Sequence, residues 1–232
     1  MIQHRGVTAH LFPPSRLGVY AVVEGSNLRR LHGTKALSDT GAAVALDGSM
    51  YSDIGSGLAR PRFLMMDQAR GVLIETRSPS DGMTISVKNG VASANTDAVV
   101  TPGATVAVQL YPELVRSGRN MANPLRDTSV VWRAALGIFR DGNLGFAVGV
   151  SSMYTFAQHL SEMGFVHAGY TDGGDSTLMA FRDGSWVGDR EHRAVSSWIL
   201  DNGSTSSETN SGDMGAVLAA IGLGWLIYEM SR

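Results

Sequence analysis

Short apolar or β-branched runs separated by turn residues recur from residue 19 to residue 150. The runs are Val19–Val23, Ala42–Leu46, Phe63–Met66, Val72–Thr76, Thr84–Val87, Thr105–Leu110, Arg133–Phe139 and Leu144–Val150. Gly, Asn, Asp and Pro stand between them, and the pairs Asn89-Gly90 and Asp141-Gly142 favour hairpins because turns of this kind require a positive φ. The pattern predicts a series of short antiparallel strands.

Only one internal segment, Ser152–Met163, shows a clear helical period. Its apolar residues recur at three- and four-residue spacing, Ser152 can cap its start, and Gly164 can end it in a left-handed conformation. A shorter helix is expected over Lys35–Asp39. We therefore predict an α+β fold, predominantly antiparallel sheet with one main amphipathic helix and a C-terminal apolar helix on a linker.

The chain changes character after Leu200, and we predict three parts: a domain over residues 1–200, a flexible polar linker over 201–213 and an apolar helix over 214–232. Met214–Tyr228 has no charged residue, and as a helix it would be about 22 Å long at ~1.5 Å per residue. That is short for a hydrocarbon core of about 30 Å. Three alternatives remain: the helix folds back on its own domain, contacts an oligomer or partner protein, or anchors in a membrane, which its length disfavours.

Composition excludes several functional classes. Lys and Arg number 19 against 21 Asp and Glu, so no basic surface is indicated and nucleic acid is not an expected partner. There is no cysteine, which excludes disulfides and thiolate chemistry. The N-terminal residues lack the apolar region of a signal peptide, so we expect synthesis in the cytoplasm.

The segment Tyr170–Met179 has the composition of a functional site. It places Asp172, Gly173, Gly174 and Asp175 between apolar residues typical of strand ends, and the hydroxyls of Ser176 and Thr177 follow. Glycines allow a ligand to approach the main chain, and the acids can transfer protons or hold sugar hydroxyls. The same acids also permit a hard cation such as Ca²⁺, although no metal is required by the pattern.

The order of motifs from Trp132 to Leu200 resembles the phosphodiester glycosidase family. The motifs, in chain order, are Arg133-Ala134-Ala135-Leu136-Gly137, Asp141-Gly142, the Ser152–Gly164 helix, Asp172-Gly173-Gly174-Asp175-Ser176-Thr177 and Arg193-Ala194-Val195. Upstream, Asp47-Gly48-Ser49 resembles the family's Asn-Gly-Gly loop. The resemblance extends over about Gly33 to Leu200 and is strongest in the second half.

This resemblance implies a glycosidase that hydrolyses a sugar-1-phosphodiester or a related bacterial surface glycan. Asp172 and Asp47 would be the catalytic acids, one acting at the anomeric carbon and one accepting a sugar hydroxyl. Arg133 and the Gly173-Gly174 backbone would hold the phosphate, and Asp175, Ser176, Thr177 and Arg193 would complete substrate binding.

Each of these residues also has a purely structural interpretation. The acids are also typical turn caps, the hydroxyls are typical local hydrogen-bonding groups, and Arg193 has the alternative of a surface residue. Arg133, in an apolar strand, needs a carboxylate partner or the substrate phosphate, and the sequence does not choose between them.

Three departures from the family pattern support an alternative function. Asp47 replaces Asn, Ala134 replaces Thr, and Asp175 replaces a third Gly. Together with the apolar tail, they are consistent with a non-catalytic structural or glycan-binding component of an assembly such as the virion, for example the tail, of a bacteriophage. The enzyme should lose turnover on loss of Asp172, whereas the scaffold should not.

Overall fold

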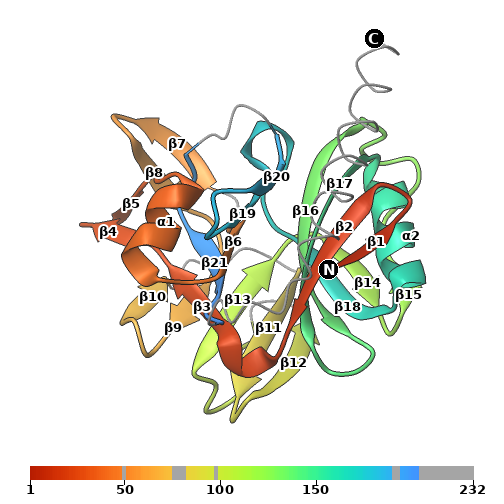
Figure 1. Cartoon of the computed structure of the whole chain (residues 1–232), viewed down its shortest axis with the longest axis horizontal. Coiled ribbons are helices and arrows are strands. Elements are labelled where there is room, and N and C mark those ends of the chain that lie inside the picture. The colour runs from red at the N-terminus through yellow and green to blue at the C-terminus, as the bar shows by residue number, and fades with distance from the viewer. Residues whose placement is uncertain (49–50, 75–81, 97–98, 190–193, 204–232) are drawn as a thin grey trace.

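The computed structural model describes residues 1–48, 51–74, 82–96, 99–189 and 194–203 (Figure 1). Strands make up 51% and helices 13% of these residues. The strands form four sheets in which every pair is antiparallel. The predicted α+β class is therefore wrong: the fold is β-rich. The two short α-helices each cover part of one sheet and do not build a layer of their own.

The largest sheet has seven strands in the order β1-β2-β17-β16-β18-β14-β15. These strands are β1 (Ile2–His4), β2 (Val7–Phe12), β14 (Glu113–Arg116), β15 (Arg119–Asn120), β16 (Val131–Phe139), β17 (Leu144–Ser151) and β18 (Phe165–Tyr170). The predicted hairpin at Asp141-Gly142 is confirmed, because β16 and β17 pair in continuous register with Arg133 opposite Gly149. Arg133 is therefore fixed on a central strand.

Helix α2 (Met153–Met163) covers one face of this sheet and packs on β14, β15, β17 and β18 (Figure 1). The Oγ of Ser152 accepts a hydrogen bond from the Thr155 N–H at 3.3 Å, and Gly164 ends the helix at φ +104°. The amphipathic helix predicted from its apolar period is thus confirmed. Its buried face comprises Met153, Phe156, Ala157, Leu160 and Met163.

Two five-stranded sheets face this layer. One has the order β10-β9-β13-β11-β12, with β9 (Met65–Asp67), β10 (Val72–Ile74), β11 (Met83–Lys88), β12 (Val91–Thr96) and β13 (Val106–Leu110). The other has the order β20-β19-β6-β21-β3, with β3 (Leu17–Tyr20), β6 (Val44–Asp47), β19 (Leu178–Phe181), β20 (Trp186–Gly188) and β21 (Trp198–Asp201). The helix expected over Lys35–Asp39 is present as α1 (Gly33–Thr40), which packs on β6 and β19.

A four-stranded sheet lies beyond α1 in the order β4-β5-β8-β7 (Figure 1). Its strands are β4 (Val22–Glu24), β5 (Asn27–Arg29), β7 (Tyr51–Gly55) and β8 (Leu58–Pro61), and two 3₁₀ turns, Pro14–Arg16 and Gly174–Ser176, complete the described elements.

One hydrophobic core joins the three larger sheets. Leu136 and Phe146 come from the seven-stranded sheet, Leu46 from β6 and Ile85 from β11, and all four side chains are fully buried. Because this core draws on both the early and the late parts of the chain, the sheets depend on one another for burial of their apolar faces.

A buried ion cluster lies at the end of β21. Asp201, which we placed first in the linker, is the last residue of β21 and is fully buried. Its carboxylate accepts two hydrogen bonds from Arg16, each 2.6 Å, and lies 2.7 Å from Nε2 of His10. The rest of the predicted linker from residue 204 and the predicted helix over 214–232 lie outside the described residues. No helix within the described ranges is both long and apolar enough to span a membrane.

Candidate functional site

The glycine-rich segment bridges two sheets. Strand β18 of the seven-stranded sheet ends at Tyr170, and β19 of the neighbouring sheet begins at Leu178. Between them Gly173 lies so close to Tyr170 that a Cβ at this position would stand 1.4 Å from the tyrosine Oη. No other residue fits there without moving the ring, so the glycine is required by close packing.

A pocket of about 740 Å³ opens on one side of this segment. Asp172, Gly173 and Gly174 contribute to its wall, and the half-buried Asp172 carboxylate accepts a hydrogen bond from the Gly173 N–H at 3.0 Å. The pocket's charged side chains are Glu113, Arg116, Arg126, Asp127, Arg133 and Asp172. Its volume lies within the range of about 300–1,000 Å³ typical of small-molecule sites.

Asp47 lies behind the loop at the end of β6 and is fully buried. Its carboxylate accepts hydrogen bonds from the Asp172 N–H at 3.1 Å, the Leu178 N–H at 3.2 Å and the Thr171 hydroxyl at 3.2 Å. Burial, and secondarily the charge of Asp172, raises the pKa of Asp47 well above its usual value, while the three hydrogen bonds act in the opposite direction. The two predicted acids are thus neighbours in different surroundings, and only Asp172 lines the pocket.

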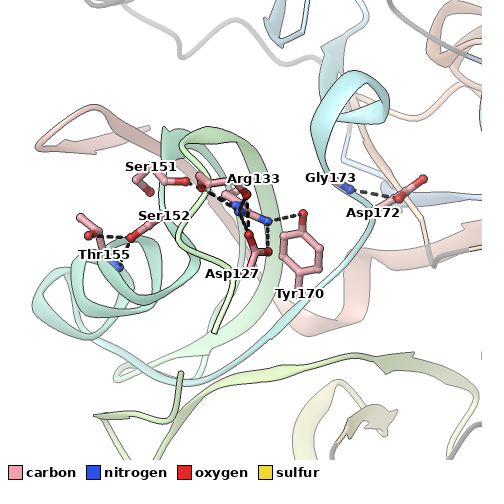
Figure 2. Close-up of polar contacts among 9 residues, drawn as sticks. Asp127, Arg133, Ser151, Ser152, Thr155, Tyr170, Asp172 and Gly173 are labelled. Carbon is pink, nitrogen blue, oxygen red and sulfur yellow. Dashed lines mark hydrogen bonds and ion pairs between the residues drawn. The ribbon is translucent and has the colours of Figure 1, made fainter. Parts of the chain in front are cut away.

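Arg133 makes an ion pair within the pocket wall. Its Nη1 and Nη2 donate to the two carboxylate oxygens of Asp127 at 2.8 and 2.9 Å, and Nη1 also donates to the Tyr170 hydroxyl at 3.3 Å (Figure 2). The backbone oxygens of Ser129 and Ser151 accept from Nη2 and Nε at 3.0 and 3.3 Å. All five N–H donors of the guanidinium are engaged, so the structure shows the ion-pair alternative for Arg133.

These contacts set the charge states of the partners. Hydrogen bonding from Arg133 holds the pKa of Asp127 below its usual value, and burial raises the pKa of Tyr170 to about 12. Figure 2 shows the Asp172 carboxylate on the other side of Tyr170 from the Asp127–Arg133 pair. Tyr170 therefore separates an ionised, fully hydrogen-bonded pair from the proposed reacting acid.

The remaining predicted binding residues are dispersed around the loop. Ser176 and Thr177 are buried, and no described residue hydrogen-bonds the Oγ1 of Thr177. Asp175 is exposed, and none of these three side chains lines the pocket. Arg193 lies outside the described residues. The described residues also contain no group of three or more His, Asp or Glu that could hold a metal ion, so Ca²⁺ binding stays a prediction.

Arg126 is a pocket cation that the sequence analysis missed. It is exposed, and no ion pair or hydrogen bond joins its guanidinium to another residue in the described part of the chain. The only other arginines in the wall, Arg116 and Arg133, are paired with Glu113 and Asp127. The polar stretch around Arg126 contains no motif that identifies this arginine. One indirect signal was present: a buried Arg133 needs a nearby carboxylate, and that carboxylate is Asp127, the residue that follows Arg126.

The sequence matches the model of a family described as "Phosphodiester glycosidase" over residues 40–212. No curated protein sequence matches significantly. The structure is similar to the catalytic domain, auto-inhibited by its pro-peptide, of zebrafish N-acetylglucosamine-1-phosphodiester α-N-acetylglucosaminidase. That likeness has a TM-score of 0.66 and 12% identity, and covers 87% of this chain and 85% of the zebrafish chain.

Two bacterial structures are also similar. A Burkholderia pseudomallei protein described as exported gives a TM-score of 0.63 at 12% identity, with 84% of this chain and 73% of that chain covered. A Synechocystis protein without a described activity gives 0.57 at 15% identity, with 84% and 58% covered. At these identities the structural matches establish a shared fold.

Proposed function

The chain belongs to the phosphodiester glycosidase family, and from this premise we propose that it hydrolyses a sugar-1-phosphodiester with Asp172 as the catalytic carboxylate. The observation that carries the proposal is the position of Asp172. It comes from the family's glycine-rich motif, and its half-buried side chain lies in the wall of a pocket that also contains an arginine without a partner among the described residues.

The reaction needs a carboxylate and an anion-binding group. The bond between the anomeric carbon and the phosphate oxygen breaks, the phosphate monoester leaves with the electron pair, and a water oxygen bonds to the anomeric carbon. The proton of that water passes to a carboxylate, here Asp172. Asp172 acting as a base on water would invert the anomeric configuration, and Asp172 acting as a nucleophile would retain it; the net bonds broken and formed are the same in both cases. The phosphate is a good leaving group and needs charge stabilisation more than protonation.

We assign phosphate binding to Arg126 in place of Arg133. Every N–H of Arg133 already donates to protein oxygens, and its carboxylate partner would be left unpaired if it moved to a substrate. Arg126 lines the same pocket with a guanidinium that no described residue engages. Guanidinium groups bind phosphate oxygens through paired, charge-assisted hydrogen bonds.

Asp47 is proposed as a positioning residue. It does not line the pocket, and its three hydrogen bonds hold the backbone on both sides of the glycine-rich loop. In this role Asp47 holds the backbone of Asp172 in place, and the need for an acceptor of three hydrogen bonds explains why a carboxylate is buried there despite the free-energy cost of burial.

The test is hydrolysis of the methyl diester of N-acetylglucosamine-1-phosphate, a probe chosen for the activity named in the zebrafish enzyme. Wild type should release the sugar, and Asp172→Asn should lose about 10²–10⁴-fold in kcat. Asp141→Asn, in an exposed hairpin turn away from the pocket, is the matched control and should retain full activity. Release of sugar at equal rates by wild type and Asp172→Asn would exclude Asp172 as the acid.

Arg126→Gln tests the phosphate site separately. We expect KM to rise about tenfold, whereas Arg119→Gln, an exposed arginine outside the pocket, should leave KM unchanged. Binding of N-acetylglucosamine-1-phosphate by wild type without turnover would favour the non-catalytic glycan-binding alternative. A virion role, and contacts of residues 214–232 with an oligomer, a partner or a membrane, stay predictions.

A further inference from the structure

Part of the pocket lining is apolar. This apolar wall contains residues from the connection between β13 and β14, from the segment after β15, from the start of β16 and from the start of α2. These residues are Tyr111, Pro112, Met121, Ala122, Val131 and Met153. None of their side chains carries a charge, and methionines adapt readily to ligands of irregular shape. The hydroxyl groups of a sugar find few hydrogen-bond partners among these side chains.

Large apolar side chains are also exposed in the segment that contains the pocket residues Met121 and Arg126. Between β15 and β16 the side chains of Met121, Leu125 and Val130 are 46%, 89% and 49% exposed. Three large apolar side chains exposed within ten residues cost free energy in water unless a ligand covers them. Leu125 and Val130 directly precede the pocket residues Arg126 and Val131, so this segment presents exposed apolar side chains next to residues of the pocket lining.

Arg126 lies within the same segment, directly after Leu125. The pairs Asp127–Arg133 and Glu113–Arg116 are internally neutral, which leaves Arg126 as the pocket cation that no described residue balances. An anion bound to Arg126 would thus share the pocket with the Asp172 carboxylate and with the apolar part of the lining. This arrangement fits a phosphodiester whose two ester groups differ in polarity.

We propose that the alcohol on the far side of the phosphate is an apolar one, an alkyl or prenyl chain that lies along the Met121–Val131 side of the pocket. The inference rests on the proposed function and specifies its substrate class: a sugar joined through phosphate to a lipid-like alcohol. The sugar would lie near Asp172, the phosphate against Arg126 and the chain on the apolar wall.

The experiment compares methyl and hexyl diesters of N-acetylglucosamine-1-phosphate, with the full chain and below micellar concentrations. Both substrates break the same bond and release a simple alkyl phosphate, so a difference in kcat/KM reports binding of the chain. We expect kcat/KM for the hexyl diester to exceed that for the methyl diester at least tenfold. Each methylene removed from water contributes about fourfold, so burial of about two of the five additional methylenes suffices.

The double variant Met121→Gln/Val131→Thr should remove most of this preference. Both substitutions preserve size, Met121 is half-exposed, and threonine is well accommodated in a strand, so the fold should be retained. Leu73→Gln is the matched control, because Leu73 is an apolar side chain, 57% exposed on β10, that does not line the pocket. It should keep the full preference for the hexyl diester.

Calorimetric titration with hexyl phosphate and methyl phosphate separates this inference from the proposed function. Hydrolysis of both diesters with equal kcat/KM would overturn the inference and leave the function standing. Tighter binding of hexyl phosphate, lost in the double variant, would support the apolar subsite even if neither diester were hydrolysed. Equal binding of the two phosphates would overturn it, as expected if a second copy or the chain's own apolar C-terminal segment covers this wall.

Discussion

Asp47 and Asp201 occupy opposite ends of one strand pair. Asp47 ends β6 opposite Trp198, whereas Asp201 ends β21 opposite Val44, and both side chains are fully buried. Asp201 contacts Arg16 and His10, and these hydrogen bonds lower its pKa against the opposing effect of burial. Asp47 has only hydrogen bonds from N–H and hydroxyl groups, no ion pair with a described residue, and a raised pKa.

The difference shows that burial alone does not fix the role of a carboxylate. With the Arg16 guanidinium as its partner, Asp201 stays ionised and closes the end of the sheet. Without such a partner, ionisation of Asp47 costs free energy of folding. The hydrogen bonds of Asp47 to both sides of the loop, directly behind the proposed reacting residue, are consistent with the positioning role proposed for it.

The largest expected effect is on stability, at Asp201. Asp201→Asn weakens the charge-assisted hydrogen bonds of the buried carboxylate, while Arg16, whose side chain is 36% exposed, stays partly solvated, so the free energy of unfolding should fall by about 2–3 kcal/mol. Urea denaturation measures the loss, with Asp141→Asn as the control for an exposed aspartate. A loss below about 1 kcal/mol would show that the contacts of Asp201 with Arg16 and His10 do not stabilise the fold.

Asp47→Asn should behave differently: the loss of one of its three hydrogen bonds should cost about 1.5 kcal/mol of stability, and the pH dependence changes. A raised pKa means that the folded state binds the extra proton above pH 3.8, so the stability of wild type relative to Asp47→Asn should fall as pH rises from 3.8. Asp201 has a lowered pKa, so its ionised form stabilises the folded state. Wild type should therefore exceed Asp201→Asn in stability by a constant amount above pH 3.8, and this difference should decline as pH falls below 3.8.

Urea denaturation of wild type and both variants across pH 3–8 measures the two slopes. Slopes of the same sign would remove the distinction between the two acids. In the activity assay, Asp47→Asn should lower kcat, because an amide cannot accept from all three donors that now hold the loop.

The smallest expected effect is at Thr171, whose hydroxyl donates to Asp47. Thr171→Val keeps the shape of the side chain and should cost about 1 kcal/mol of stability. It should also raise the pKa of Asp47 further, which moves the pH-dependent loss of stability to higher pH. An unchanged pH profile would show that the backbone N–H groups alone determine the charge state of Asp47.

The local elements of this fold could be predicted from the sequence. The Ser152 cap, the apolar period and Gly164 define α2, and Asp141-Gly142 defines the β16–β17 hairpin, because these signals act between neighbouring residues. The predicted α+β class was wrong. A clear helical period shows that a helix forms, but it does not show what fraction of the residues is helical, and here strands dominate. Asp201 was read as linker because the polar residues after it masked its place in β21.

The site was predictable only in part. The glycine-rich motif indicated a loop between two strand ends, and the structure has this loop between β18 and β19. The pairing of Arg133 with Asp127, and the resulting isolation of Arg126, depends on how the segment before β16 folds back over the pocket. Neither the composition of that segment nor its spacing from Arg133 contains this information. The burial of Asp47 likewise depends on packing between sheets.

The hydrogen bonds of Asp47 have a consequence for folding kinetics. They join residues 124, 125 and 131 positions apart along the chain, so the back of the loop forms only when the chain's early and late parts have met. Contacts of such separation form late because loop-closure entropy opposes them until other pairings exist. The proposed hydrolase activity should therefore return after secondary structure during refolding, and its recovery would report the final docking of the sheets.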